Sequence, residues 1–205
     1  MSELRALLTT ALDRLLAEHP VLRAVEAGEW PAQLWAALEE QGLTLALVPE
    51  AQGGVGLSWG DAAALWQVLG RHGAPVPLGE AMLAARLLAD AGIEVPDGVL
   101  ALSIGGPAPF GRHAARLVLA EGGRVALHAA QVAEHGANLG REPRDGMAPG
   151  PAIARGRAEH GRAPLLGLAL LRAAQMAGAL EAVLAQAVEW ANTRKQFGRA
   201  IGKFQ

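Results

Sequence analysis

The chain has 205 residues, of which 51% are hydrophobic, and its formal net charge is −2. This composition supports a folded core in one large domain or two small ones, and it gives no electrostatic case for nucleic-acid binding. Because the sequence contains no cysteine, disulfides, thiolate metal sites and a cysteine nucleophile are excluded, and a cytoplasmic location is expected.

The N-terminal part of the chain predicts a series of helices. Apolar residues recur at helical spacing over residues 3–18, 21–27, 33–41, 59–69 and 79–91. Glu3, Arg5 and Asp13 interrupt the first apolar pattern, which is therefore an amphipathic helix and not a signal peptide. Ser58 is placed to cap the helix that begins at residue 59, and Gly70 and Gly73 are expected to end it.

Glycine-rich and β-like segments follow these patterns. The loop that contains Gly53, Gly54 and Gly56 could in principle cradle a phosphate, but its spacing is not that of a nucleotide-binding turn. Short apolar runs between glycine and proline breaks predict strands over 99–104, 117–120 and 125–128, the last two as a hairpin. Residues 138–163 are rich in glycine, proline and charge, with one further strand expected near 151–154. The predicted fold class is α+β, mostly α.

The end of the chain predicts one long helix followed by a basic turn. From about residue 165 to Thr193 the apolar residues keep a helical spacing, and the longest unbroken apolar run, 164–171, is too short to span a membrane. Arg194, Lys195 and Arg199 then surround Phe197 and Gly198. Such a stretch is typical of a helix C-terminus, although Arg194 could also bind a phosphate or a carboxylate.

Two motifs carry a family resemblance. TRKQFGRAIGKFQ resembles the R-x-Q-F-G-x-x-I-G-x-F-Q signature of acyl-CoA dehydrogenases, a flavoprotein family, and LVPEAQGGVGLS is similar to that family's V-P-E-x-x-G-G-x-G-L loop. The positions that match the first signature are Arg194, Gln196, Phe197, Gly198, Ile201, Gly202, Phe204 and Gln205. The resemblance implies an N-terminal helical domain over 1–94, a reduced β middle domain over 95–163, and the first helix of an incomplete C-terminal helical bundle over 164–205.

The resemblance also implies a cofactor and partners. In the family the matching residues contact FAD, largely across a dimer interface, which makes the expected cofactor-binding residues Arg194, Gln196, Phe197, Phe204 and Gln205. The implied substrate is an acyl-CoA, the implied assembly is a homo- or hetero-oligomer with another acyl-CoA dehydrogenase-like subunit, and electron-transfer flavoprotein is a possible electron acceptor. No nucleic acid and no membrane span are expected.

The residues that the chemistry requires are not all present. The resemblance implies that the catalytic glutamate of most members lies beyond residue 205 and that of a minority at the position of Leu168, so no catalytic residue can be named in this chain. Positions that contact acyl-CoA in the family fall at Leu166 and Ala169. The family's T-E-P-x-x-G-S-D segment is not found in the middle region, where REPRD (residues 141–145) is similar to a segment of relatives with a reduced middle domain.

Three hypotheses remain open. The first is a polypeptide of an FAD-dependent acyl-CoA dehydrogenase, an enzyme for α,β-dehydrogenation of an acyl-CoA thioester, which is incomplete as this chain and is not expected to turn over an acyl-CoA alone. The second is a non-catalytic subunit that completes the FAD site of a related dehydrogenase, and the third is an inactive remnant with exposed apolar surface. The histidines have no paired spacing on a helix face, so no metal site is expected. Core positions are expected for Trp35, Trp59, Trp66 and Trp190.

Overall fold

The computed structural model describes residues 3–19, 28–158 and 163–204. The helix expected over 21–27 lies outside the described residues. The α-helices of the described part are α1 (Glu3–Glu18), α3 (Ala32–Glu40), α4 (Trp59–His72), α5 (Leu78–Asp90) and α6 (Ala163–Thr193). Single 3₁₀ turns lie at η1 (Leu43–Leu45), η2 (Glu50–Gln52), η3 (Gly111–His113) and η4 (Ile201–Lys203).

Between α5 and α6 the chain forms one mixed sheet. Its strands are β1 (Leu100–Ser103), β2 (Ala108–Pro109), β3 (Arg116–Glu121), β4 (Arg124–Glu134) and β5 (Arg144–Arg157). Their order is β1-β3-β4-β5-β2; β1 runs parallel to β3, and the other pairs are antiparallel. The expected hairpin of β3 and β4 is present, and the fold is α+β and mostly α, as the sequence predicts.

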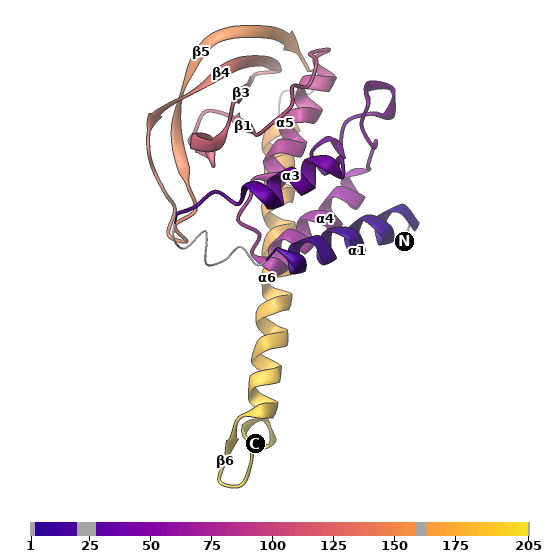
Figure 1. Cartoon of the computed structure of the whole chain (residues 1–205), viewed down its shortest axis with the longest axis vertical. Helices are drawn as coiled ribbons and strands as arrows, with labels where there is room; N and C mark the ends of the chain where they lie inside the picture. The colour runs from indigo at the N-terminus through magenta and orange to yellow at the C-terminus, as the bar shows by residue number, and fades with distance from the viewer. Residues whose placement is uncertain (1–2, 20–27, 159–162, 205) are drawn as a thin grey trace.

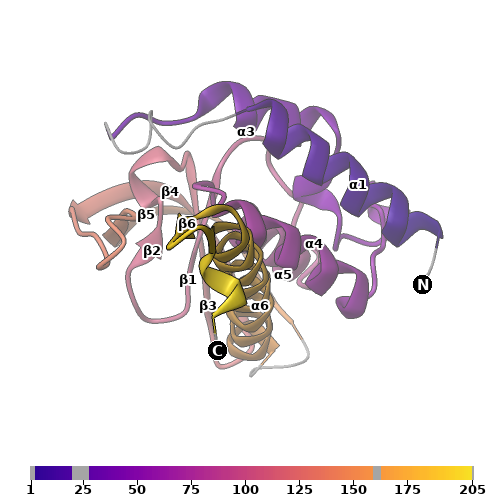
Figure 2. The same ribbon diagram turned by 90° about the horizontal axis from the view of Figure 1, so that it is seen from below.

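The hydrophobic core lies between the helices and continues onto the inner face of the sheet. Trp66 of α4 is fully buried and its indole Nε1 donates to Sδ of Met82 on α5 at 3.4 Å. Val118 and Val125 extend this core into the sheet, which packs against α5. Figures 1 and 2 show the helices α1, α3, α4 and α5 beside the sheet, with α6 running past α4 and α5 and then projecting beyond both.

Helix α4 shows how local chemistry sets both ends of an element. Ser58 caps it as expected, since its Oγ accepts from the backbone N of Asp61 at 3.2 Å. The helix continues past Gly70 to His72, and Gly73, with φ +56°, caps it as expected. Gly70 lies inside the helix, at a position where α6 passes so close that a Cβ would overlap the backbone of Gln175.

Strand β5 is much longer than the short strand expected near residues 151–154. Pro149 and Pro151, which weaken a strand prediction, lie in its central part. Only the first residues of β5 pair with β2, so most of β5 has β4 on one side and an unpaired edge on the other. A proline is tolerated at such an edge because its missing N–H interrupts no ladder there.

The prediction that all four named tryptophans lie in the core is wrong for two of them. Trp35 and Trp66 are buried, but Trp59 is 42% exposed and Trp190 is 55% exposed. Trp190 lies on the second half of α6, beyond the helices against which its first half packs. A helical apolar pattern predicts one buried face, but burial also requires a neighbouring element in reach.

Candidate functional site

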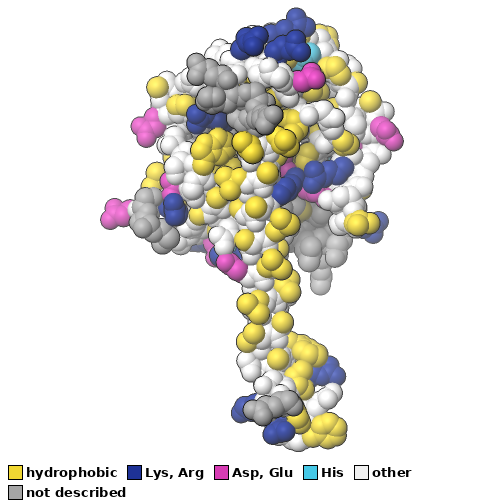
Figure 3. Space-filling model, turned by 180° about the vertical axis from the view of Figure 1, so that it is seen from behind, with side chains coloured by type: hydrophobic (Ala, Val, Ile, Leu, Met, Phe, Trp, Pro, Cys, Tyr) yellow, Lys and Arg dark blue, Asp and Glu magenta, His cyan; other side chains and the backbone are white. Residues whose placement is uncertain are grey.

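The second half of α6 extends away from the rest of the chain and carries an exposed apolar surface. We call this surface the α6 stripe; it consists of Leu180, Val183, Leu184 and Val188. Figure 3 shows hydrophobic side chains along the projecting helix and basic side chains at its end. The first half of α6, in contrast, packs against α4 and α5.

A small hairpin follows α6. We call residues 194–204 the tip. Strand β6 (Lys195–Gln196) pairs with β7 (Arg199–Ala200), and the two residues between them have positive φ: +50° at Phe197 and +81° at Gly198. Two positive φ values are what a type I′ turn requires. Phenylalanine rarely adopts this conformation, which costs backbone strain, and the turn holds the Phe197 side chain 94% exposed.

The tip combines cations with aromatic rings. Arg194, Lys195, Arg199 and Lys203 supply four positive charges, and residues 194–204 contain no acid. The guanidinium carbon of Arg194 lies 5.0 Å from the centre of the Trp190 ring, and that of Arg199 lies 4.0 Å from the Phe204 ring. Phe197 and Phe204 meet edge to face at 6.4 Å. The stacked guanidinium groups keep their N–H edges free to bind an anion.

The tip brings together four of the five residues that the sequence predicts to bind cofactor. Arg194 is the residue after α6, Gln196 pairs with Arg199 in the hairpin, and Phe197 and Phe204 contact each other. Gln205 lies outside the described residues. Exposed guanidinium groups beside exposed aromatic rings have the chemistry to hold a diphosphate and to cover an adenine ring, so these residues fit FAD.

The positions that the family uses for substrate lie at the other end of α6. Leu166 and Ala169 are exposed, and Leu168 packs partly against the core. All three side chains are apolar, so none can accept a proton. Glu181, further along α6, accepts from Nε2 of Gln67 at 2.6 Å and lies 3.6 Å from Nη2 of Arg71. It therefore pairs with α4.

A buried carboxylate was missed by the sequence reasoning. Asp145, the last residue of REPRD, is 0% exposed and pairs with Arg112, whose Nη2 donates to Oδ1 at 2.6 Å and whose backbone N donates to Oδ2 at 2.9 Å. Burial acts to raise the pKa of Asp145, but the hydrogen bonds and charge of Arg112 outweigh it and hold the pKa below its ordinary value. No short-range pattern of acidic and basic residues indicates this pairing, because 33 residues separate Arg112 from Asp145.

A second buried carboxylate joins two helices. Glu80 of α5 is buried and forms an ion pair with Nη2 of Arg172 on α6. Burial raises the pKa of Glu80, and the positive charge of Arg172 opposes this shift only in part. In the part of the chain that the structure describes, no group of three or more His, Asp and Glu side chains could hold a metal ion. The two buried carboxylates, Asp145 and Glu80, instead form ion pairs that join different elements of the fold.

Comparison with known proteins decides the family. A family model described as "Acyl-CoA dehydrogenase, N-terminal domain" matches residues 2–95, and one described as "Acyl-CoA dehydrogenase, C-terminal domain" matches residues 156–205. The chain is 32% identical over 222 residues to acyl-CoA dehydrogenase IpdE2 of Mycobacterium tuberculosis, covering 99% of this chain and 68% of that protein. The chain belongs to the acyl-CoA dehydrogenase family. That family is one of FAD-dependent oxidoreductases, and the resemblance seen in the two motifs is confirmed.

Solved structures share the fold. A Tcur3481–Tcur3483 steroid ACAD variant is 25% identical with a TM-score of 0.77, covering 99% of this chain and 70% of that one. The ChsE4–ChsE5 complex of Mycobacterium tuberculosis is 23% identical with a TM-score of 0.76, covering 100% and 71%. A glutaryl-coenzyme A dehydrogenase in complex with glutaryl-CoA is 16% identical with a TM-score of 0.75, covering 100% and 70%.

Helix α6 is long and apolar on average. By length and composition alone, residues 164–193 could cross a membrane, because only single polar residues interrupt the apolar pattern beyond residue 171. Arg172 on this helix pairs with buried Glu80, and the helix lies in the segment that matches the model of the family's C-terminal domain. The first half of α6 is therefore packed as part of the folded chain.

Proposed function

We propose that this chain is one polypeptide of an FAD-dependent acyl-CoA dehydrogenase, and that its tip completes an FAD site together with another acyl-CoA dehydrogenase-like subunit. The observation that best supports this proposal is the position of the tip. Arg194, Gln196 and the exposed rings of Phe197 and Phe204 lie at the end of a projecting helix, away from the chain's own core. A site built there needs its other walls from outside the described residues, and this is the role that we propose for the second subunit.

The tip residues have distinct roles in this proposal. Arg194 binds the diphosphate of FAD, Gln196 donates to the linker or the ribose, and Phe197 and Phe204 cover the adenine side. When bound, FAD supplies the hydride acceptor for α,β-dehydrogenation of an acyl-CoA thioester. Electron-transfer flavoprotein is the electron acceptor that we propose, and the cytoplasm is the proposed location.

The proposal assigns the catalytic base to the partner. Removal of the proton next to the thioester requires a carboxylate in reach of it, and Leu168 stands where some relatives carry one. The ChsE4–ChsE5 structure is described as a complex of two different proteins, which supports a hetero-oligomer here. The non-catalytic-subunit and remnant hypotheses are the alternatives to this assignment.

The test is retention of flavin. The chain is purified alone and after co-expression with an acyl-CoA dehydrogenase-like protein from the same genome, and the visible spectrum is recorded with and without added FAD. Co-purifying flavin is expected only with the partner. Arg194→Ala should weaken FAD binding by about tenfold to a hundredfold, because a charge-assisted hydrogen bond contributes roughly 1.5–3 kcal/mol.

Lys203→Ala is the matched control, since it removes the same charge from the same tip at a position outside the signature. It should leave flavin binding close to that of the unmodified complex. Addition of acyl-CoA to the flavin-loaded complex should bleach the flavin band. A complex that forms but holds no flavin would show that the tip does not complete an FAD site.

A further inference from the structure

Three arginines lie on one face of the sheet, far from the tip. In the register of β4 and β5, Arg124 is opposite Arg157, and Ala126 is opposite Arg155. Because side chains alternate between the two faces of a strand, the residues at these paired positions share a face. The opposite face is buried: Gly156 lies against Ala91 at the end of α5.

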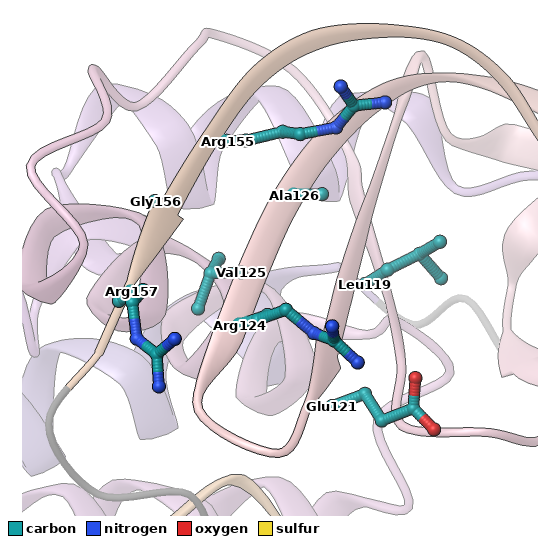
Figure 4. A pocket seen from close by; sticks show the side chains of 8 residues that line it. All are labelled: Leu119, Glu121, Arg124, Val125, Ala126, Arg155, Gly156 and Arg157. Carbon is teal, nitrogen blue, oxygen red and sulfur yellow. The ribbon is translucent and has the colours of Figure 1, made fainter.

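These arginines line a cavity of about 530 Å³. Leu119 of β3 and Ala126 of β4 contribute an apolar floor, and Glu121 is the one acid among the lining residues of this cavity. Figure 4 shows the side chains of Arg124, Arg155 and Arg157 rising from the adjoining strands around this floor. The volume lies within the range of small-molecule sites, and the lining combines apolar surface with three arginine side chains from two neighbouring strands.

In the part of the chain that the structure describes, none of the three guanidinium groups forms an ion pair with a carboxylate. Glu121 is opposite Arg124 in the register of β3 and β4 and offsets one of the three positive charges, which leaves an excess of positive charge at the cavity. Like charges directly opposite each other on neighbouring strands are destabilising, which is the arrangement of Arg124 and Arg157. A bound anion between them converts this repulsion into attraction, and a guanidinium fork matches the oxygens of a phosphate.

We propose that this arginine pocket binds a ligand that carries two or more phosphate groups. Three guanidinium groups exceed what one phosphate needs, and the floor of Leu119 and Ala126 offers an apolar surface to the rest of the ligand. The pocket is separate from the tip: Arg124 and Arg155 lie in the stretch between the two segments that match the family models. The inference is therefore independent of the proposed FAD site.

Isothermal titration calorimetry of the purified chain tests the pocket, with inorganic pyrophosphate and ADP as probes at low ionic strength. Saturable binding of one equivalent is expected. Arg155→Gln and Arg157→Gln should each weaken it about tenfold, because each removes a charge-assisted contact. Tighter binding of ADP than of pyrophosphate would show that the apolar floor takes the nucleoside, and equal binding would show recognition through phosphates alone.

Arg14→Gln is the matched control, since it removes one exposed arginine from α1. It should leave binding unchanged, and far-UV circular dichroism should be the same for all three variants because all three positions are exposed. Absence of saturable binding, or an equal loss in the control, would overturn the proposal. So would association of another polypeptide through these arginines without binding of either probe.

Discussion

Asp145 illustrates how a single charge is accommodated in the middle region. The carboxylate is shielded from water, yet its two oxygens accept from the side chain and the backbone of Arg112, and Gly136 N lies 3.4 Å from Oδ1. A buried ion stays ionised only when such partners replace its hydration. The pair joins η3, which precedes β3, to the start of β5. It therefore holds together two segments that are far apart in the chain.

Asp145→Asn should lower the free energy of unfolding by about 3 kcal/mol near neutral pH, since it leaves Arg112 without its buried partner. The pKa of Asp145 is lowered in the folded state, so its contribution is present above the unfolded-state value, about 4, and is lost as pH falls through the folded-state pKa. Urea unfolding of the unmodified protein and of the Asp145→Asn variant, from neutral to acid pH, measures the loss of stability and its pH dependence. Equal stabilities of the two proteins at neutral pH would contradict it.

At the scale of elements, the crossing of α4 and α6 determines the helical packing. A Cβ at Gly178 would overlap the carbonyl of Gln67, and a Cβ at Gly70 would overlap that of Gln175. Reciprocal glycines let the two backbones touch, and the Gln67–Glu181 and Arg71–Glu181 contacts flank the crossing. The direction in which α6 projects is therefore set by backbone contact as well as by side-chain packing.

Gly178→Ala should lower the free energy of unfolding by about 2–3 kcal/mol, because the new methyl group has to push a backbone away. Gly60→Ala is the control on α4, where a Cβ would meet its nearest neighbour at 3.4 Å, an ordinary van der Waals contact. That change should be neutral or slightly stabilising, since alanine is the better helix former. Thermal unfolding compares them, and similar melting temperatures for both variants would argue against a tight crossing.

At the scale of the whole molecule, α6 divides into a packed half and an exposed half. Figure 1 shows the second half and the tip beyond the outline of the helices and the sheet. The α6 stripe is a continuous apolar face of a kind that folded proteins normally cover. Its apolar residues recur at helical spacing, so the stripe forms a seam along which another helix can pack.

Leu184→Glu should weaken association of the chain, with itself or with a partner, by about tenfold, because it places a charge on the apolar seam. The free energy of unfolding of the isolated chain should not change, since Leu184 is 65% exposed. Leu139→Glu is a control at an exposed residue outside the stripe. Sedimentation velocity over a range of concentrations measures both, and equal effects of the two changes would rule out a specific seam.

Much of the local structure follows from short-range chemistry. Helix periodicity, the Ser58 cap and the alternation of strands predicted the described helices and the β3–β4 hairpin, since these signals depend on residues within a few positions of one another. The signature over residues 194–205 and the loop near Gly54 were sufficient to indicate the family. The assignment of FAD contacts to Arg194, Gln196, Phe197, Phe204 and Gln205 stays a prediction.

The sequence by itself therefore determined the described α-helices, the β3–β4 hairpin, the fold class and the family of this protein. Only the tertiary structure decided that Asp145 is buried beside Arg112, that Gly70 lies inside a helix, and that three arginines surround one cavity. It also decided that Trp190 and the tip lie away from the core. These features depend on contacts between residues far apart in the chain, and periodicity within one segment carries no information about which other segment lies against it.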